Sequence, residues 1–340
     1  MTPLDQLLLA QTPEEQKAAL KAWKKAHGSV FEFLATMSQP GTVASLVSPE
    51  RFAELLNAYQ RSRRNYLAQI KRNMAAFAQD EFEYHMLLYS LAEHLEGDLE
   101  SVRPIMEKML LNRDTEIVGV ATQLFDRMGT AAWASWPVIR KAFARHGVWE
   151  IPFHLGNAVV AAVREEPQRL ESLRSALLEM QDKEQQALCQ VLVELGTLAA
   201  PLTDTVFSIA DSKTAAPDTI NCAIMALGYL GVTNPRISTL IGSAIDSEHW
   251  FIRANAIGSA GLLHLDPDTF IPLIARHLDD HFGHDGWSAA TAAVKALGQY
   301  GPAAHSSCDA LEGMMKTTDD EDIRIAVSEA LALIRQKSQA

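Results

Sequence analysis

The chain has 340 residues, 48% of them hydrophobic and 21% charged, which is enough apolar material for a core and excludes wholesale disorder. Lys and Arg number 30 against 42 Asp and Glu, and the net charge of −12 disfavours a nucleic-acid backbone as the partner. Aromatic residues make up only 7% of the chain. The apolar fraction depends on Ala and Leu, which favour helices, so we expect an all-α protein.

The cysteines and the N-terminus indicate a cellular compartment. Cys189, Cys222 and Cys308 are odd in number and lie far apart in apolar helical patterns, which suits free buried thiols in a reducing environment. The first residues lack the basic start and long apolar stretch of a signal peptide. By inspection, no apolar run reaches the length of about 18 residues that spans a membrane. We therefore expect a cytoplasmic protein.

Residues 1–75 form the first predicted part of the chain. Helical stripes are present, but Pro40-Gly41 interrupts them, and the segment carries ten Lys and Arg against six Asp and Glu. Residues 76–340 carry twenty against thirty-six. We interpret residues 1–75 as an atypical N-terminal cap on a repeat array at 76–340, because terminal units must cover an exposed apolar face. A separate small helical domain is the alternative.

The N-terminal part contains a basic helical segment with Tyr66 interleaved. Its cations are Arg61, Arg63, Arg64, Lys71 and Arg72. Such a segment can contact nucleic acid or an acidic partner, and it can equally be a solvated helix face. We retain Arg61, Arg64 and Lys71 as candidate partner-binding residues.

A repeat of about 33 residues dominates the rest of the chain. Five segments end on small residues: Leu195-Gly196, Leu227-Gly228, Ala260-Gly261, Leu297-Gly298 and Leu331-Ala332. Their spacings are 32, 33, 37 and 34 residues, and Gly129 and Gly97 extend the series upstream. Apolar residues precede each ending at helical spacing, as in Ala223, Ile224 and Leu227.

Each repeat unit is predicted to contain two helices. The small residues allow neighbouring helices to approach, and the glycines are expected to end the helices through positive φ. Helix starts are predicted at Pro217-Asp218, at Asp246-Ser247-Glu248 and at Thr318-Asp319-Asp320. The second helices of the units are predicted at Pro235–Ile245, Phe270–Leu278 and Ala303–Met315.

The repeat pattern resembles the short HEAT-like repeats of the phycobilisome-lyase type. The residues that carry the resemblance are Ile252-Arg253 followed by Ala256, Ile323-Arg324, and the endings at 226–231 and 296–302. Only two units keep the Arg. The resemblance implies a right-handed α-α superhelix, a HEAT-like solenoid of about seven or eight helical pairs.

The long spacing of 37 residues marks an insertion rich in His and Asp. The candidate metal ligands in it are His277, His281, His284 and Asp285. His277 and His281 are four residues apart, so a continued helix would present both imidazoles on one face, a chemistry that suits Zn²⁺ or Fe²⁺. Gly283 and Gly286 indicate a loop instead, and an inserted loop can bind a partner or be solvated surface.

Trp250 and Trp287 occupy the same repeat position, eleven residues before Gly261 and Gly298. They should therefore stack on one edge of adjacent units. An aromatic pair of this kind can anchor a partner, since Trp is favoured at interface hot spots. It can equally serve the packing of the repeats.

Enzymatic hypotheses find little support in the motifs. None of the eleven His residues is followed by Glu, so the paired His-Glu dipeptides of deoxyhypusine hydroxylases are missing. Trp133, Trp136 and Asp126 are the residue types used by alkylpurine DNA glycosylases, without a clear motif around them. Nucleophile-elbow, Walker and dinucleotide motifs are absent as well.

The sequence favours a non-catalytic protein-binding scaffold that needs no cofactor and whose partner has a basic surface, because residues from 197 onward carry nine Lys and Arg against seventeen Asp and Glu. Two alternatives stay open. One is a metal-dependent enzyme or enzyme accessory at the His277–Asp285 loop, and the other is nucleic-acid binding through the basic N-terminal helices.

Overall fold

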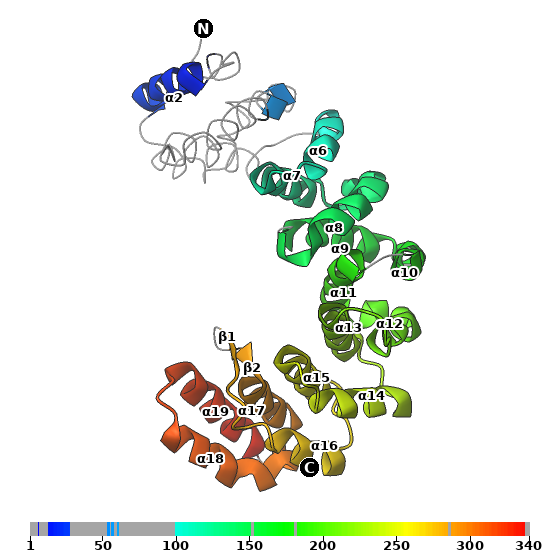
Figure 1. Cartoon of the computed structure of the whole chain (residues 1–340), viewed down its shortest axis with the longest axis vertical. Coiled ribbons are helices and arrows are strands. Elements are labelled where there is room, and N and C mark those ends of the chain that lie inside the picture. Colours follow the sequence, from blue (N-terminus) through cyan, green and yellow to red (C-terminus); the bar gives the residue numbers. More distant parts are fainter. Residues whose placement is uncertain are drawn as a thin grey trace. The chain divides into compact units, whose positions relative to one another are not determined.

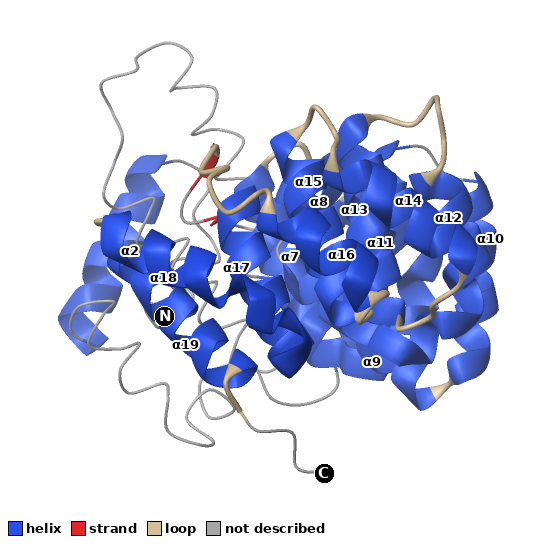
Figure 2. Ribbon diagram, turned by 90° about the horizontal axis from the view of Figure 1, so that it is seen from below, coloured by secondary structure: helices blue, strands red, loops and turns tan. Residues whose placement is uncertain are grey.

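The computed structural model describes residues 13–27, 99–150, 153–179, 182–284 and 287–336, together with a few single positions before residue 61. The chain divides into two compact units, residues 1–162 and 163–340. The described residues are helical almost throughout, with one short hairpin (Figure 2). The predicted cap boundary at residue 75 lies outside the described residues.

The first unit contains four α-helices and two short 3₁₀ segments among its described residues, and a further helix begins in it. These elements are α2 (Pro13–His27), η1 (Leu99–Ser101), α6 (Arg103–Leu110), α7 (Thr115–Met128), η2 (Gly129–Ser135), α8 (Trp136–Glu150) and α9 (Phe153–Glu165). Helix α7 begins where the Asp114 carboxylate accepts a hydrogen bond from the Glu116 amide. It packs against α6 and buries Phe125 completely.

The second unit is built from helix pairs. Its elements are η3 (Pro167–Arg169), α10 (Leu170–Glu179), α11 (Asp182–Leu195), η4 (Gly196–Leu202), α12 (Thr203–Ala210), α13 (Pro217–Leu230), α14 (Pro235–Ile245), α15 (Trp250–Leu262), α16 (Pro267–Ala275), β1 (Gly283–His284), β2 (Trp287–Ser288), α17 (Ala289–Tyr300), η5 (Gly301–Ser307), α18 (Cys308–Thr317) and α19 (Glu321–Ile334).

These helices form two rows. In the main row, α11, α13, α15, α17 and α19 each pack against the next. In the flanking row, α10, α12, α14, α16 and α18 each pack against the main-row helix that follows it in the chain. Figure 1 shows α12 and α14 on the same side of α13 and α15. The all-α architecture of stacked helix pairs that the sequence predicted is confirmed.

The predicted helix boundaries agree with the observed ones to different degrees. Helix α14 spans Pro235–Ile245, as expected. Asp320 caps α19 by accepting hydrogen bonds from the amides of Asp322 and Ile323. Asp246-Ser247-Glu248 precede α15 as expected, but none of them is its N-cap: Asp246 is the C-cap of α14 and the N-cap of α15 is His249.

Close backbone approach explains the repeated small residues. A Cβ atom added to Gly228 would lie 2.9 Å from Ser259 Cα, and one added to Gly261 would lie 2.9 Å from Ala296 Cα. At Gly298 the corresponding distance to Ala330 Cα is 3.1 Å. Real Cβ atoms rarely come this close to another heavy atom. At Gly228 and Gly261 the main-row helices can therefore keep this separation only with glycine, and at Gly298 an added Cβ would require the neighbouring helix to shift by a few tenths of an ångström.

The expectation that these same glycines end their helices is wrong. Helix α13 continues to Leu230, α15 to Leu262 and α17 to Tyr300. In each of these three repeats, the residue with positive φ lies three residues after the glycine of the close contact. The residues with positive φ are Gly129, Gly196, Gly231, His264 and Gly301. Gly196 therefore corresponds to Gly231 and not to Gly228, because its role is to turn the chain.

Buried polar contacts connect the main-row helices in addition to apolar packing. Asn255 Nδ2 donates to Asn221 Oδ1 at 2.8 Å. Ser259 Oγ donates to the carbonyl of Ile224 at 2.9 Å. The hydroxyl of Tyr300 donates to the carbonyl of Ala260 at 3.1 Å. Because buried polar groups are costly to leave unpaired, these contacts favour one alignment of each helix on its neighbour.

The run Asp182–Ala210 is long and apolar enough to cross a membrane by length and composition alone, since its most apolar 18-residue window has a mean hydropathy of 1.3. In the fold, this run bends at Gly196 and comprises α11, η4 and α12. Half of its most apolar 18-residue window is buried inside the protein, and α11 packs against α13. Its apolar side chains therefore contribute to the core of the helix stack.

Replacing one glycine in each of two neighbouring helices tests whether close helix packing requires glycine. Gly228→Ala should lower the free energy of unfolding by about 1–3 kcal/mol, because the added methyl group overpacks against Ser259. Gly258→Ala is the control, since an added Cβ there meets no atom within 4 Å. It should be neutral or stabilise by up to about 1 kcal/mol through helix propensity. Urea denaturation followed by circular dichroism measures both, and equal effects would contradict the packing role.

Candidate protein-binding surface

Trp250 and Trp287, which occupy the same position in adjacent repeats, are in contact. Trp250 is the first residue of α15, and Trp287 lies in β2 directly before α17. Their ring centroids are 4.9 Å apart at an interplanar angle of 71°, an edge-to-face arrangement that aromatic pairs favour. The predicted contact between adjacent repeats is therefore present, but the rings meet edge to face and are not stacked. Trp287 keeps 39% of its surface exposed, so it can also contact a partner.

A short hairpin carries Trp287 and adds a third ring. Strand β1 pairs antiparallel with β2, with Gly283 opposite Ser288 and His284 opposite Trp287. A side chain at Gly283 would collide with the carbonyl oxygen of Trp287, so glycine is required there. Phe282, directly before the hairpin, is 69% exposed and lies 6.3 Å from Trp250 between ring centroids.

Arg253 ties the base of this hairpin to α15. Its guanidinium donates to Asp280 Oδ2 at 2.8 Å and to the carbonyls of Ser247 and Glu248 at 2.9 and 3.1 Å. Arg253 and Asp280 are 16% and 21% exposed, so solvent screens the pair only partly. Arg324 similarly donates to the carbonyl six residues before it. The repeated Ile-Arg pattern in the sequence therefore marks an Arg that holds the preceding turn.

A depression of about 390 Å³ lies beside the aromatic cluster, and we call it the main-row groove. Its walls come from three successive helices and β2: Tyr229, Gly258, Leu262, Trp287, Thr291, Ala292, Lys295, Ala296 and Gln299. The glycine and the alanines leave the space, while Tyr229, Leu262 and Trp287 form exposed apolar sides. Such a hollow can accept an apolar side chain, with Lys295 and Gln299 able to bond polar groups beside it.

Tyr229, Leu262 and Phe282 belong to this surface but were not predicted from the sequence. A signal existed for the first two, because Tyr229, Leu262, Gln299 and Leu333 recur at one repeat position, one residue after the small residues Gly228, Gly261, Gly298 and Ala332. Tyr229, Leu262 and Leu333 are 44%, 38% and 45% exposed. Large apolar residues at an exposed position of successive units indicate an interaction surface.

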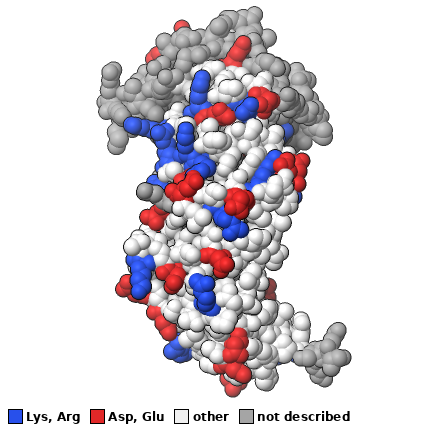
Figure 3. Space-filling view, turned by 90° about the vertical axis from the view of Figure 1, so that its right-hand side faces the viewer, with Lys and Arg blue, Asp and Glu red and all other residues white. Residues whose placement is uncertain are grey.

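The charge of the second unit is strongly negative. It carries 13 Lys and Arg against 24 Asp and Glu, a difference of −11. Several of these acids are paired within their own helix, such as Glu171 with Arg174 and Glu321 with Arg324. Figure 3 shows acidic side chains on one face of the molecule, several of them next to Lys or Arg. A cationic partner would be attracted by the acids that remain in excess.

The candidate metal ligands are not brought together by a helix. Helix α16 ends at Ala275, so His277 and His281 do not share a helical face. The Nδ1 of His277 lies 3.6 Å from Asp280 Oδ2, which is already bound by Arg253, and His281 is exposed. No group of three metal-binding side chains occurs within the described part of the chain. Asp285 and the His284 side chain lie outside it.

Other sequence candidates fall in the first unit. Arg61, Arg64 and Lys71 lie outside the described residues. Trp133 and Trp136 stack with ring centroids 4.8 Å apart. Asp126 Oδ2 lies 2.7 Å from His154 Nδ1, and Asn157 Nδ2 donates to the same oxygen at 3.4 Å. The sequence did not indicate His154 as a partner of Asp126, because the two residues are 28 positions apart on different helices.

The three cysteines are free and buried, as predicted. Burial raises the pKa of the Cys189 thiol well above its ordinary value, with a smaller contribution from neighbouring Cys222. Burial, assisted by Asp218, raises the pKa of Cys222 to about 11. Only the thiolate is a good nucleophile. At neutral pH these two buried thiols are therefore held mainly in the protonated form, which is a poor nucleophile.

Comparison with known proteins supports the repeat architecture. Residues 237–332 match the family model of HEAT repeats, which is less than half of the chain. No curated protein matches the chain. The solved structures similar to it include the karyopherin Kap121p bound to the extreme C-terminus of the protein phosphatase Cdc14p, at 12% identity and a TM-score of 0.51. That match covers 96% of this chain and 41% of Kap121p.

Two further structures have lower scores. A Kap121p mutant, D353K/E396K/D438K, matches at 10% identity and a TM-score of 0.44, covering 97% of this chain and 44% of that one. Human deoxyhypusine hydroxylase in complex with glycerol matches at 12% identity and a TM-score of 0.32, covering 95% and 98%. The chain thus spans less than half the length of the karyopherin chains it matches. Residues 237–332 form a HEAT-repeat region within an all-α solenoid.

Replacing Arg253 tests the anchor of the hairpin. Arg253→Met should lower the free energy of unfolding by about 2–4 kcal/mol, because it leaves Asp280 and two carbonyls without their donor. Arg324→Met is the matched control, since Arg324 is 44% exposed and pairs with a Glu321 that is 72% exposed. It should cost less than about 1 kcal/mol. Thermal unfolding measures both, and a smaller loss in Arg253→Met would contradict the anchoring role.

The cysteine pKa shifts can be tested by alkylation. At pH 8, iodoacetamide should modify Cys222 about a hundredfold more slowly in the folded protein than in urea, because its thiolate fraction is depressed. The folded-state rate should rise about tenfold per pH unit until the pH approaches 11. Peptide mass spectrometry gives the rate at each cysteine. Equal rates in the folded and unfolded protein would show that the thiol is not held in its neutral form.

Proposed function

We propose that the protein is a non-catalytic protein-binding scaffold whose second unit holds a partner at the main-row groove and the adjoining aromatic cluster. The observation that carries this proposal is the alignment of Tyr229, Leu262 and Trp287, exposed apolar residues from successive units, around one depression. Large apolar side chains rarely lie next to one another on the exposed surface of a protein unless they contact another molecule. HEAT-repeat solenoids commonly serve as protein-binding scaffolds.

The physical properties of the surface suit protein recognition. Aromatic anchors with polar groups at their rim are typical of interface hot spots. The Trp250–Trp287 contact and the Arg253–Asp280 pair hold the anchors in place before binding. A pre-ordered surface loses little conformational entropy when the partner docks. A catalytic role would instead require titratable groups gathered in a cleft, and among the described residues that line the main-row groove only Lys295 and Tyr229 are titratable.

The excess of acidic residues in the second unit favours a partner with a basic surface. Kap121p, whose fold is similar, has been solved with the extreme C-terminus of a protein phosphatase bound to it. By analogy, a chain terminus or other extended segment of a partner suits this surface. Arg61, Arg64 and Lys71 are proposed as a separate contact for an acidic partner segment.

Three related hypotheses belong to this proposal. We place the protein in the cytoplasm, where reduced cysteines persist. Residues 1–75 are proposed as the cap of the array. The likeness of the repeats to the phycobilisome-lyase type concerns the repeat pattern only, and none of the residues that carry it is specific for a bilin.

Site-specific crosslinking tests the main-row groove. A photo-crosslinking amino acid at Leu262 should capture a protein in cells that express the chain, while the same residue at Ser208, an exposed position of α12, should not. The captured protein is then purified and titrated against the full chain. Trp287→Ala combined with Tyr229→Ala should weaken its binding by about 2 kcal/mol or more, roughly thirtyfold.

The same titration examines the charge argument. Binding should weaken between 0.05 and 0.5 M salt if the partner surface is basic, since screening shortens the range of attraction to a few ångströms. Leu333→Ala serves as a control with an exposed apolar residue at the same repeat position but outside the groove lining. An affinity unchanged by the double replacement, in protein with unaltered thermal stability, would refute this surface as the binding site.

A further inference from the structure

The flanking row contains a gap between α12 and α14. Neighbouring flanking helices α10 and α12 pack against each other, and so do α14 and α16, but α12 and α14 make little contact. Two hollows of about 380 and 390 Å³ occupy this gap and share Leu240 and Ser243. We call them together the flanking groove. None of its lining residues belongs to the main-row groove.

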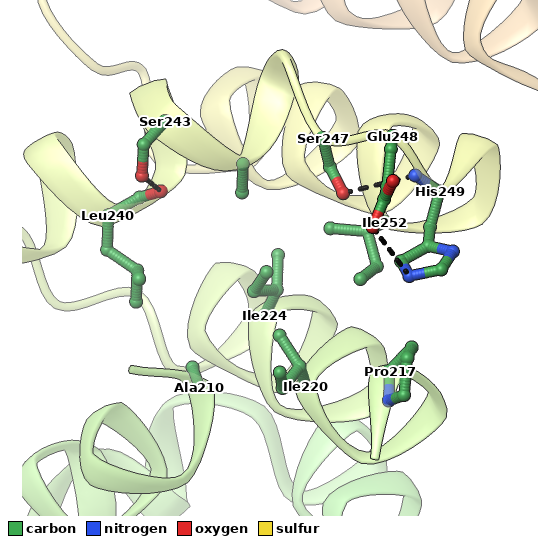
Figure 4. A pocket seen from close by; sticks show the side chains of 11 residues that line it. Ala210, Pro217, Ile220, Ile224, Leu240, Ser243, Ser247, Glu248, His249 and Ile252 are labelled. Atoms are coloured by element: carbon green, nitrogen blue, oxygen red, sulfur yellow. Dashed lines mark hydrogen bonds and ion pairs between the residues drawn. The ribbon is translucent and has the colours of Figure 1, made fainter. Parts of the chain in front are cut away.

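The floor of the flanking groove is apolar. Figure 4 shows Ile220 and Ile224 of α13 below Leu240 of α14 and Ile252 of α15, with their side chains directed toward one space. Ile224 and Ile252 are buried, whereas Ile220 and Leu240 are partly accessible. The hydroxyl of Ser243 at the rim donates to the carbonyl of Leu240 at 2.8 Å, so its donor is already used. An apolar side chain can fill this space without leaving polar groups unpaired.

The charged rim of the groove is mainly acidic. Asp211 lines one end and Glu248 the other. The Glu248 side chain is 90% exposed, with His249 Nε2 at 3.7 Å. Arg236 is the one Lys or Arg among the described residues that line the groove, and its guanidinium lies 4.3 Å from the centre of the Phe207 ring, where a cation–π contact holds it. Residues 203–252 carry two Lys and Arg against five Asp and Glu.

We infer that the flanking groove is a second binding site, for a peptide segment of a partner protein that presents an apolar anchor side chain with Lys or Arg within a few residues of it. The apolar floor takes the anchor, and Asp211 and Glu248 attract the cationic residues on either side. Charge complementarity of this kind selects a partner and accelerates its association. This inference does not depend on the main-row groove.

Peptide selection tests the site with the full chain immobilised. A displayed library of random twelve-residue peptides is selected on the unmodified protein and counter-selected on Ser243→Trp, which fills the groove from an exposed position. Ser208→Trp is the matched control, because Ser208 is also exposed and also donates to a carbonyl of its own helix. Thr239→Trp, exposed at the other hollow, replaces Ser243→Trp if the latter loses thermal stability.

Peptides that depend on the groove should carry a large apolar residue flanked by Lys or Arg. They should bind Ser208→Trp as well as the unmodified protein and should also bind Trp287→Ala, which separates this site from the main-row groove. Binding of such a peptide should fall about three- to tenfold on Glu248→Lys at low salt, but not on Asp268→Lys, which changes an exposed acid on α16.

Two outcomes would overturn the inference. Failure to enrich any peptide sensitive to Ser243→Trp would show that the groove takes no peptide. Enrichment of apolar peptides without basic residues would show that the acidic rim selects nothing.

Discussion

Helices α13 and α15 each approach the next main-row helix so closely that one residue, Gly228 or Gly261, must lack a side chain, and the packing around them depends on this constraint. At Gly228 and Gly261 the neighbouring helix lies where a Cβ would have to be. The separation brings Ser259 Oγ within 2.9 Å of the Ile224 carbonyl, and it brings the hydroxyl of Tyr300 to the carbonyl of Ala260. Apolar packing determines how near the helices are, and these hydrogen bonds determine how far one helix can slide along the next.

This close stacking determines where functional side chains can be exposed. Most residues of α13 are buried, including Thr219 and Asn221, so the helix offers few positions to solvent along its length. Tyr229, one residue after the contact glycine, is one of them. The same position in α15 is Leu262, and the main-row groove forms between them because Gly258 and the alanines of α17 are small. The residues that permit stacking and the residues that form the surface are therefore neighbours in each repeat.

The sequence predicted the elements whose determinants are local and periodic. The helix pairs, the start of α14 and the cap at Asp320 follow from spacing and from side chains within three residues, and the Trp250–Trp287 contact follows from the repeat position. Features that depend on contacts between repeats and leave no periodic signal in the sequence were missed. The two roles of glycine could not be told apart from the sequence. A glycine that allows a neighbouring helix to approach closely and a glycine that ends a helix with positive φ look alike in the sequence and lie only three residues apart. The pairing of Arg253 with Asp280 across 27 residues gave no local signal.

Both candidate binding sites lie where the repeat departs from regularity. The extra residues of the 37-residue spacing form the hairpin that carries Trp287, and Phe282 lies just before it. On the other row, α12 and α14 make little contact, unlike α10 and α12 or α14 and α16, and the flanking groove lies between them. Each unit of a solenoid contacts only its neighbours, so a local irregularity leaves the other interfaces unaltered. The entropic cost of lengthening a connection grows only slowly with its length. A repeat array can therefore acquire specific binding surfaces at its irregular junctions while the glycine contacts maintain the stack.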